Sequence, residues 1–133
     1  MFPDRESELV ALSQWAQLLR SDGIEPDEIA VLVRSEELVE EFSDFDKFVL
    51  LPMHEAKGAE FRAVAVAALD HDKLPDEGRI YAARDEPQLD EVMATERHLL
   101  YVAATRARDH LWLSGVEPIS EFLADILEAA ARS

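Results

Sequence analysis

Short apolar runs alternate along the chain with segments in which apolar residues recur every three or four positions. The run Ile29–Val33 is too short for a helix of usual length, and it predicts a strand buried on both faces. Phe48–Leu51, ended by Pro52, predicts a second buried strand. Ala63–Leu69 and Leu111–Leu113 predict a third and a fourth.

Helical spacing fills most of the chain between these strands. It predicts helices over Asp4–Arg20, Glu36–Phe42 and Pro87–Ala107, and a last helix that opens at Pro118. Residues 70–86 are rich in Asp, Pro, Gly and Glu and predict a long loop. Strands that alternate with helices indicate an α/β fold, with a mostly parallel sheet flanked by helices.

Composition limits the function classes. A length of 133 residues with 48% hydrophobic content predicts a single domain over residues 1–133. The 29 acidic and 13 basic residues give a net charge of −16, which repels phosphate, so contact with nucleic acid would need a local basic site or a partner. The absence of cysteine excludes a disulfide framework and a cysteine-ligated metal site, and it fits the cytoplasm. We expect no metal site and no membrane segment.

Residues 53–61 form the first candidate site, a polar segment that follows the second predicted strand. Ligands of open α/β sheets bind at the carboxyl ends of the strands. Lys57 beside Gly58 offers a cation next to a flexible backbone N–H, which suits a phosphate. Glu60 could accept hydrogen bonds from a ribose, and His54 could contact a phosphate or a base. The alternative is an ordinary turn with a solvated lysine and glutamate.

The predicted helix up to Ala107 carries the second candidate site. Its apolar arc is bordered by Arg106 on one side and Arg108 on the other. A guanidinium there could bind a phosphate, or it could pair with one of the many carboxylates. Glu96 falls near the centre of the same arc, where an unpaired carboxylate is unfavourable. We therefore predict a fixed cationic partner for Glu96, with Lys57, Arg106 and His54 as candidates.

Both segments resemble motifs of one family. HEAKGAEFRAVAV, from His54, resembles motif V of the UvrD/Rep-type superfamily 1 DNA helicases, and ERHLLYVAATRARDHLWLS, from Glu96, resembles their motif VI. IAVLVR, ending at Arg34, resembles an upstream strand of the same half. The resemblance runs from about Ala30 to Ser114.

The resemblance implies the C-terminal RecA-like half of a helicase motor, a three-layer domain. It implies that Arg106 reaches the γ-phosphate of ATP and is the catalytic residue this half supplies, and that Glu60, Lys57 and Gly58 contact the nucleotide. It further implies nucleic-acid contacts by residues of three segments: His54, Arg108 and Arg34. Glu96 and Tyr101 would help to hold the loops in place.

The implied cofactors are ATP and Mg²⁺, and the implied partners are an N-terminal RecA-like half and single-stranded DNA. The chain departs from the family pattern in several respects. It has no G-x-x-x-x-G-K-[ST] phosphate cradle, no Asn-Tyr-Arg-Ser stretch and no large insertion before motif V, and Ala59 replaces the usual leucine. We therefore expect no ATP hydrolysis by the chain alone. Two alternatives are a non-enzymatic, helicase-like protein-interaction module and a nucleotide-binding domain that hydrolyses nothing.

Overall fold

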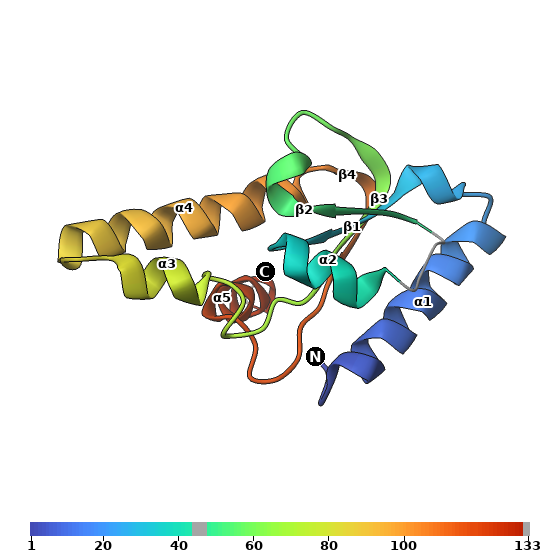
Figure 1. The fold of residues 1–133 in the computed structure, drawn as a ribbon. Helices are drawn as coiled ribbons and strands as arrows, with labels where there is room; N and C mark the ends of the chain where they lie inside the picture. The colour runs from blue at the N-terminus through green and yellow to red at the C-terminus, as the bar shows by residue number, and fades with distance from the viewer. Residues whose placement is uncertain (44–47, 132–133) are drawn as a thin grey trace.

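A four-stranded parallel sheet forms the centre of the computed structural model, which describes residues 1–43 and 48–131 (Figure 1). The strands are β1 (Ile29–Val33), β2 (Val49–Pro52), β3 (Phe61–Val66) and β4 (Ala107–Leu113). Their order in the sheet is β2-β1-β3-β4, and each neighbouring pair is parallel. The predicted α/β class is confirmed.

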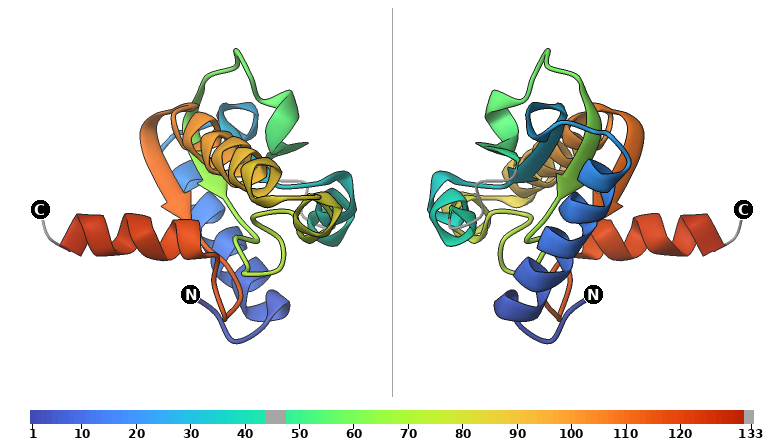
Figure 2. Two further views of the ribbon diagram at one scale, coloured as in Figure 1. Left: turned by 90° about the vertical axis from the view of Figure 1, so that its left-hand side faces the viewer. Right: turned by 90° about the vertical axis from the view of Figure 1, so that its right-hand side faces the viewer.

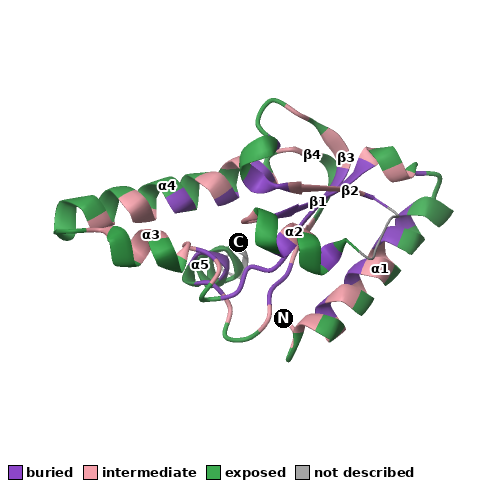
Figure 3. Ribbon diagram, viewed as in Figure 1, coloured by how far each residue is buried: buried purple, intermediate pink, exposed green. Residues whose placement is uncertain are grey.

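Helices cover both faces of this sheet, because alternate residues of each strand point to opposite sides. On one face, Ile29, Val31 and Val33 pack with residues of α1 (Arg5–Ser21) and α2 (Glu36–Phe42). On the other face, Ala30 and Leu32 pack with α4 (Glu86–Ala104) and α5 (Glu121–Ala131). Figure 3 shows the buried residues concentrated along the sheet and on the inner faces of the helices. The fold therefore has the three layers expected.

Strand position in the sheet decides burial. All residues of β1 are buried, as predicted, because β1 has a strand on each side. The prediction of a second buried strand over Phe48–Leu51 was wrong for most of its length: Phe48 is buried, but Val49, Leu50 and Leu51 are only half-buried. The physical reason is that β2 is an edge strand and has only one neighbour.

A capping side chain marks the start of helix α1, and a glycine follows its end. The side chain of Asp4 accepts a hydrogen bond of 2.8 Å from the backbone N–H of Ser7 and so caps the helix. Two residues after the helix, Gly23 takes a positive φ of 92°, a conformation that favours glycine.

Several predicted boundaries were wrong. Helix α4 ends at Ala104 and not at Ala107, because Ala107 pairs with Phe61 and begins β4. The segment 70–86 contains a short helix, α3 (Glu77–Ala82), and the last helix begins at Glu121 rather than Pro118.

Within residues 1–43 and 48–131, no helix has the length and apolar character needed to cross a bilayer.

Helix α5 projects away from the sheet. Its first turn is anchored, since Phe122 and Leu123 are each 1% exposed, whereas Ile126 and Leu127 are about two-fifths exposed (39% and 42%). Figure 2 shows the distal part of this helix extending from the body in both views.

Candidate functional site

The segment between β2 and β3 runs from the carboxyl ends of the strands back to their amino ends. It begins with a 3₁₀ helix, η2 (Met53–Glu55), at the carboxyl end of β2, and it ends at Glu60, just before β3 begins. The chain must return in this way because β2 and β3, which lie on either side of β1, are parallel and therefore start at the same end of the sheet. The expectation that residues 53–61 lie at the carboxyl edge therefore holds only for the start of the segment.

Two apolar side chains hold this segment against α4. Met53 and Ala56 are buried in the same core cluster as Leu100 and Ala103. Beyond Ala56 the chain turns, and the N–H of Ala59 donates to the carbonyl of Ala56 at 3.0 Å.

The tip of the segment is exposed to solvent. Lys57, Gly58 and Glu60 are exposed, and so is His54 at the start of the segment. Gly58 has a φ of 82°, and no heavy atom lies within 4 Å of where a Cβ would stand. A ligand can therefore approach the backbone of Gly58 closely, provided that the residue stays glycine.

Arg106 lies directly beside this segment, in the turn between α4 and β4. Its backbone carbonyl accepts from the N–H of Phe61 at 2.9 Å. The guanidinium donates to the carbonyl of Val102 (3.1 Å), the carbonyl of Ala59 (3.4 Å) and the hydroxyl of Thr105 (3.3 Å). All three acceptors are uncharged, so the charge of Arg106 is held in position without being neutralised by them. The fold thus joins the two candidate sites predicted from the sequence.

The periodicity predicted that Arg108 borders the apolar arc of a helix, and this prediction was wrong. Arg108 is exposed on β4, since the helix ends four residues earlier, and its guanidinium donates to Asp109 at 3.4 Å. Asp109 also accepts from Arg62 at 3.2 Å. The contact of Arg108 with nucleic acid stays a prediction.

Glu96 has fixed cationic partners, as predicted, but they are not the three candidates named from the sequence. Its side chain is fully buried. Arg34 binds both carboxylate oxygens at 2.8 Å, and Arg79 donates at 2.7 Å. The backbone N–H of Asp76 donates at 2.6 Å. The three candidates named from the sequence, Lys57, Arg106 and His54, were wrong. Arg79 was not considered because it lies in the segment predicted as a loop, where the structure has the helix α3 packed against α4.

Charge pairing decides the protonation state of Glu96. Burial by itself raises the pKa of this carboxyl, but the hydrogen bonds from Arg34, Asp76 and Arg79 outweigh burial and leave the pKa lowered. The hydrogen bonds to Glu96 in turn raise the pKa of Arg34. Arg34 is therefore engaged with Glu96 in this structure, and its predicted contact with nucleic acid is untested.

A second buried carboxylate, Glu8 of α1, was missed in the sequence. It accepts hydrogen bonds from Arg5, from the N–H of Ala68 at 2.9 Å and from the hydroxyl of Ser114 at 2.6 Å. Arg5 also pairs with Asp70 at 2.5 Å. The sequence did contain a sign of this burial: Glu8 lies four residues before Leu12, so helical periodicity places it on the apolar face of the helix. This network fixes α1 to the carboxyl ends of β3 and β4.

Comparisons with known proteins agree with this architecture. The profile of the UvrD-like helicase C-terminal domain matches residues 4–117. The chain is 43% identical over 67 residues to YjcD of Bacillus subtilis (strain 168), whose name assigns it to the ATP-dependent DNA helicases; the match covers 49% of this chain and 8% of that protein. It is 37% identical over 112 residues to a probable DNA helicase of Mycoplasma pneumoniae, covering 77% of this chain and 20% of that protein.

A solved structure shows the same fold. The C-terminal domain of a possible DNA helicase from Lactobacillus plantarum WCFS1 aligns with a TM-score of 0.69 and 20% identity, covering 92% of this chain and 75% of that one.

The four-stranded parallel sheet with helices on both faces matches the fold of this solved helicase C-terminal domain. The chain belongs to the UvrD-like helicase C-terminal domain family, as the two motifs predicted. It spans a fifth or less of the length of the two curated relatives, 8% and 20%.

Proposed function

We propose that this chain is the C-terminal motor half of an ATP-dependent DNA helicase and that it completes an ATP site held mainly by an N-terminal half. In this proposal, ATP and Mg²⁺ bind at the interface of the two halves. Family membership supports the general role. The residue roles rest on the surroundings of Arg106.

The charge state around Arg106 is the observation that carries the proposal. In the described part of the chain, five arginines are partly buried, and four of them form ion pairs with carboxylates: Arg5, Arg34, Arg62 and Arg79. Arg106 is the fifth, and within the described part of the chain its guanidinium donates hydrogen bonds to neutral oxygens of Val102, Ala59 and Thr105. In a chain with 29 acidic residues, such an arginine is suited to an external anion.

The chemistry of the donors fits the terminal phosphate of a nucleotide. A positioned guanidinium stabilises negative charge that develops on a transferring phosphoryl group. Arg106 is held by its hydrogen bonds to Val102 and Ala59, so its orientation needs little reorganisation when a phosphate arrives. We assign it the role of binding and stabilising the γ-phosphate.

The exposed tip of the neighbouring segment supplies the remaining contacts in this proposal. Glu60 accepts hydrogen bonds from the nucleotide at its ribose, while Lys57 and the N–H of Gly58 face its phosphates. His54 and Arg108 contact single-stranded DNA, and Arg34 does so when released from Glu96. Because residues 53–60 and Arg106 are joined through Ala59, a change at the nucleotide can move the segment that contacts DNA.

Comparing the chain alone with the chain joined to its N-terminal half tests the proposal. The isolated chain should bind ATP and Mg²⁺ too weakly for calorimetry and should show no turnover, since it lacks a phosphate cradle. The joined polypeptide should hydrolyse ATP and be stimulated by single-stranded DNA. Turnover by the isolated chain, or a joined polypeptide that hydrolyses ATP as fast as the N-terminal half alone, would refute the composite site.

A further inference from the structure

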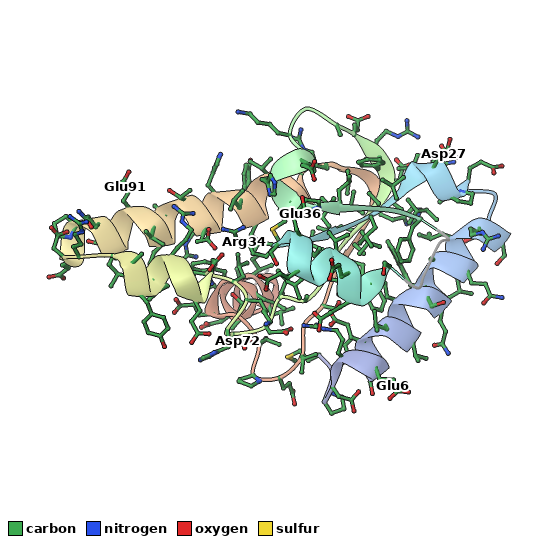
Figure 4. All side chains as sticks on the ribbon, in the orientation of Figure 1. Glu6, Asp27, Arg34, Glu36, Asp72 and Glu91 are labelled. Carbon is green, nitrogen blue, oxygen red and sulfur yellow. The ribbon has the colours of Figure 1, made fainter. Side chains whose placement is uncertain are left out.

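Three potential metal ligands from two separate segments of the sequence meet beside the sheet: Glu36 comes from one, and the adjacent His54 and Glu55 come from the other. A ligand atom of each of Glu36, His54 and Glu55 lies within 4.8 Å of the other two. In residues 1–43 and 48–131 this is the one group of three such side chains that the structure brings so close, although the sequence contains 29 acidic residues. Figure 4 labels Glu36 at the start of α2, close to the turn after β2.

Ordered backbone holds these three side chains together. Strands β1 and β2 run parallel, and Val33 pairs with Pro52, so the residues that follow both strands emerge at one edge of the sheet. Ser35 caps α2 by accepting a hydrogen bond from Leu38, which fixes the first turn that carries Glu36. On the other segment, Met53 is 2% exposed and anchors η2, which carries His54 and Glu55.

The group concentrates negative charge without a basic partner. Neither Glu36 nor Glu55 forms an ion pair with a lysine or arginine of the described residues. Arg34, the nearest basic residue in the sequence to Glu36, is engaged with Glu96. Two carboxylates this close repel each other, and a bound cation would relieve the repulsion.

We propose that Glu36, His54 and Glu55 bind a divalent transition-metal ion of the Zn²⁺ class. One imidazole nitrogen and two carboxylates form a donor set that Zn²⁺ accepts, whereas Mg²⁺ and Ca²⁺ prefer oxygen ligands alone. All three residues are exposed, so the ion has an entry path, and water can occupy the remaining position.

Metal binding would connect two segments that are otherwise separate in the sequence. The ion would fasten η2, the start of the segment that ends beside Arg106, to the first turn of α2. The site requires neither nucleotide nor the N-terminal half, so metal binding can be tested on this chain alone. His54 is also assigned a DNA contact above, and an imidazole that binds the ion is not free to contact DNA.

Isothermal titration of the full chain with Zn²⁺ at neutral pH tests this site, with unfolding in EDTA as a check that each variant folds. Wild-type protein should bind one ion, and His54→Ala and Glu36→Gln should each weaken binding by at least about tenfold, since even outer-shell changes have effects of that size. His98→Ala and Glu37→Gln change the same residue types outside the group and should bind like wild type. Mg²⁺ at the same concentration should not compete.

Two results would overturn the proposal. One is that wild-type protein shows no binding of Zn²⁺. The other is that His54→Ala and the control His98→Ala bind Zn²⁺ with the same affinity, which would assign the binding to the acidic surface in general.

Discussion

Replacing Glu96 with glutamine removes the charge of a fully buried carboxylate and leaves its shape almost unchanged. In the wild-type protein this carboxylate accepts two hydrogen bonds from Arg34, one from Arg79 and one from the backbone of Asp76. The amide of glutamine would turn an N–H group toward these donors. The variant therefore removes the close countercharge of the Arg34 guanidinium, which is 13% exposed, and leaves only the carboxylate of Asp76 at 3.8 Å.

The size of the effect follows from this burial. Breaking a buried ion pair by removing one partner destabilises a protein by about 3–5 kcal/mol. Since Arg79 is 39% exposed and can be hydrated instead, we expect the lower end, about 3 kcal/mol. A domain of this size has a total stability of about 5–15 kcal/mol, so the variant should still fold at 25 °C.

Urea unfolding followed by circular dichroism measures this loss. With a slope of about 2 kcal/mol per molar urea, the midpoint should fall by about 1.5 M while the slope stays the same. The pH dependence gives a second readout. Because the pKa of Glu96 is lowered in the folded state, its contribution is fully present above the usual value of 4.5 and is lost as pH falls further through the folded pKa. The difference between wild type and Glu96→Gln should therefore shrink below about pH 4.5.

Two results would refute this account of Glu96. A loss of less than about 1 kcal/mol at pH 7 would mean that the carboxylate is not a buried, paired charge. A double-mutant cycle with Arg34→Met that shows additive effects would mean that the two side chains do not interact.

Three further substitutions test the packing. Gly115→Ala should destabilise the protein by about 1–3 kcal/mol in thermal unfolding, because the new Cβ would stand 2.5 Å from the carbonyl oxygen of Leu69. Glu8→Gln should lower stability in urea by about 3 kcal/mol, because it removes the fully buried one of the two carboxylates that pair closely with Arg5 and leaves only Asp70. Arg97→Ala should change global stability by less than about 1 kcal/mol, since its ion pair is exposed. It should nevertheless speed amide hydrogen exchange in α5, because Arg97 lies 4.4 Å from the ring centroid of Phe122.

Matched variants separate these effects from general sensitivity to mutation. Gly78→Ala lies within a helix, and the nearest atom to its new Cβ is a side-chain oxygen at 3.3 Å, so it should be far milder than Gly115→Ala. Glu6→Gln changes an exposed glutamate of α1 and should be within about 0.5 kcal/mol of wild type. Equal losses in a variant and its control would contradict the corresponding packing argument.

The sequence predicted the parts of the fold that depend on local pattern. The apolar run Ile29–Val33 became β1, a central strand, and the helix predicted over Asp4–Arg20 became α1 (Arg5–Ser21). Prediction from the sequence was wrong where pairing with a neighbouring strand decides the structure. Ala107 has a helical position by periodicity, but pairing with Phe61 places it in β4. Val49–Pro52 has the composition of a buried strand, yet it has a neighbour on one side only.

The candidate site shows the same division. Motif spacing located Arg106 and the segment that contains Glu60, and the fold places them side by side. Distance along the chain hid the partners of Glu96, because Arg34 lies 62 residues away. The group of Glu36 with His54 was equally hidden, since only the pairing of Val33 with Pro52 brings their segments together.

The kinetics of Arg106→Ala in the joined polypeptide show whether Arg106 stabilises the transferring phosphate. ATP turnover at saturating ATP and single-stranded DNA should fall by about 10³-fold or more, while the affinity for a non-hydrolysable ATP analogue changes much less. The matched control Arg20→Ala, an exposed arginine of α1, should retain turnover. Turnover by Arg106→Ala within about threefold of the control would contradict the claim, since a loss that small is well under 1 kcal/mol of transition-state stabilisation.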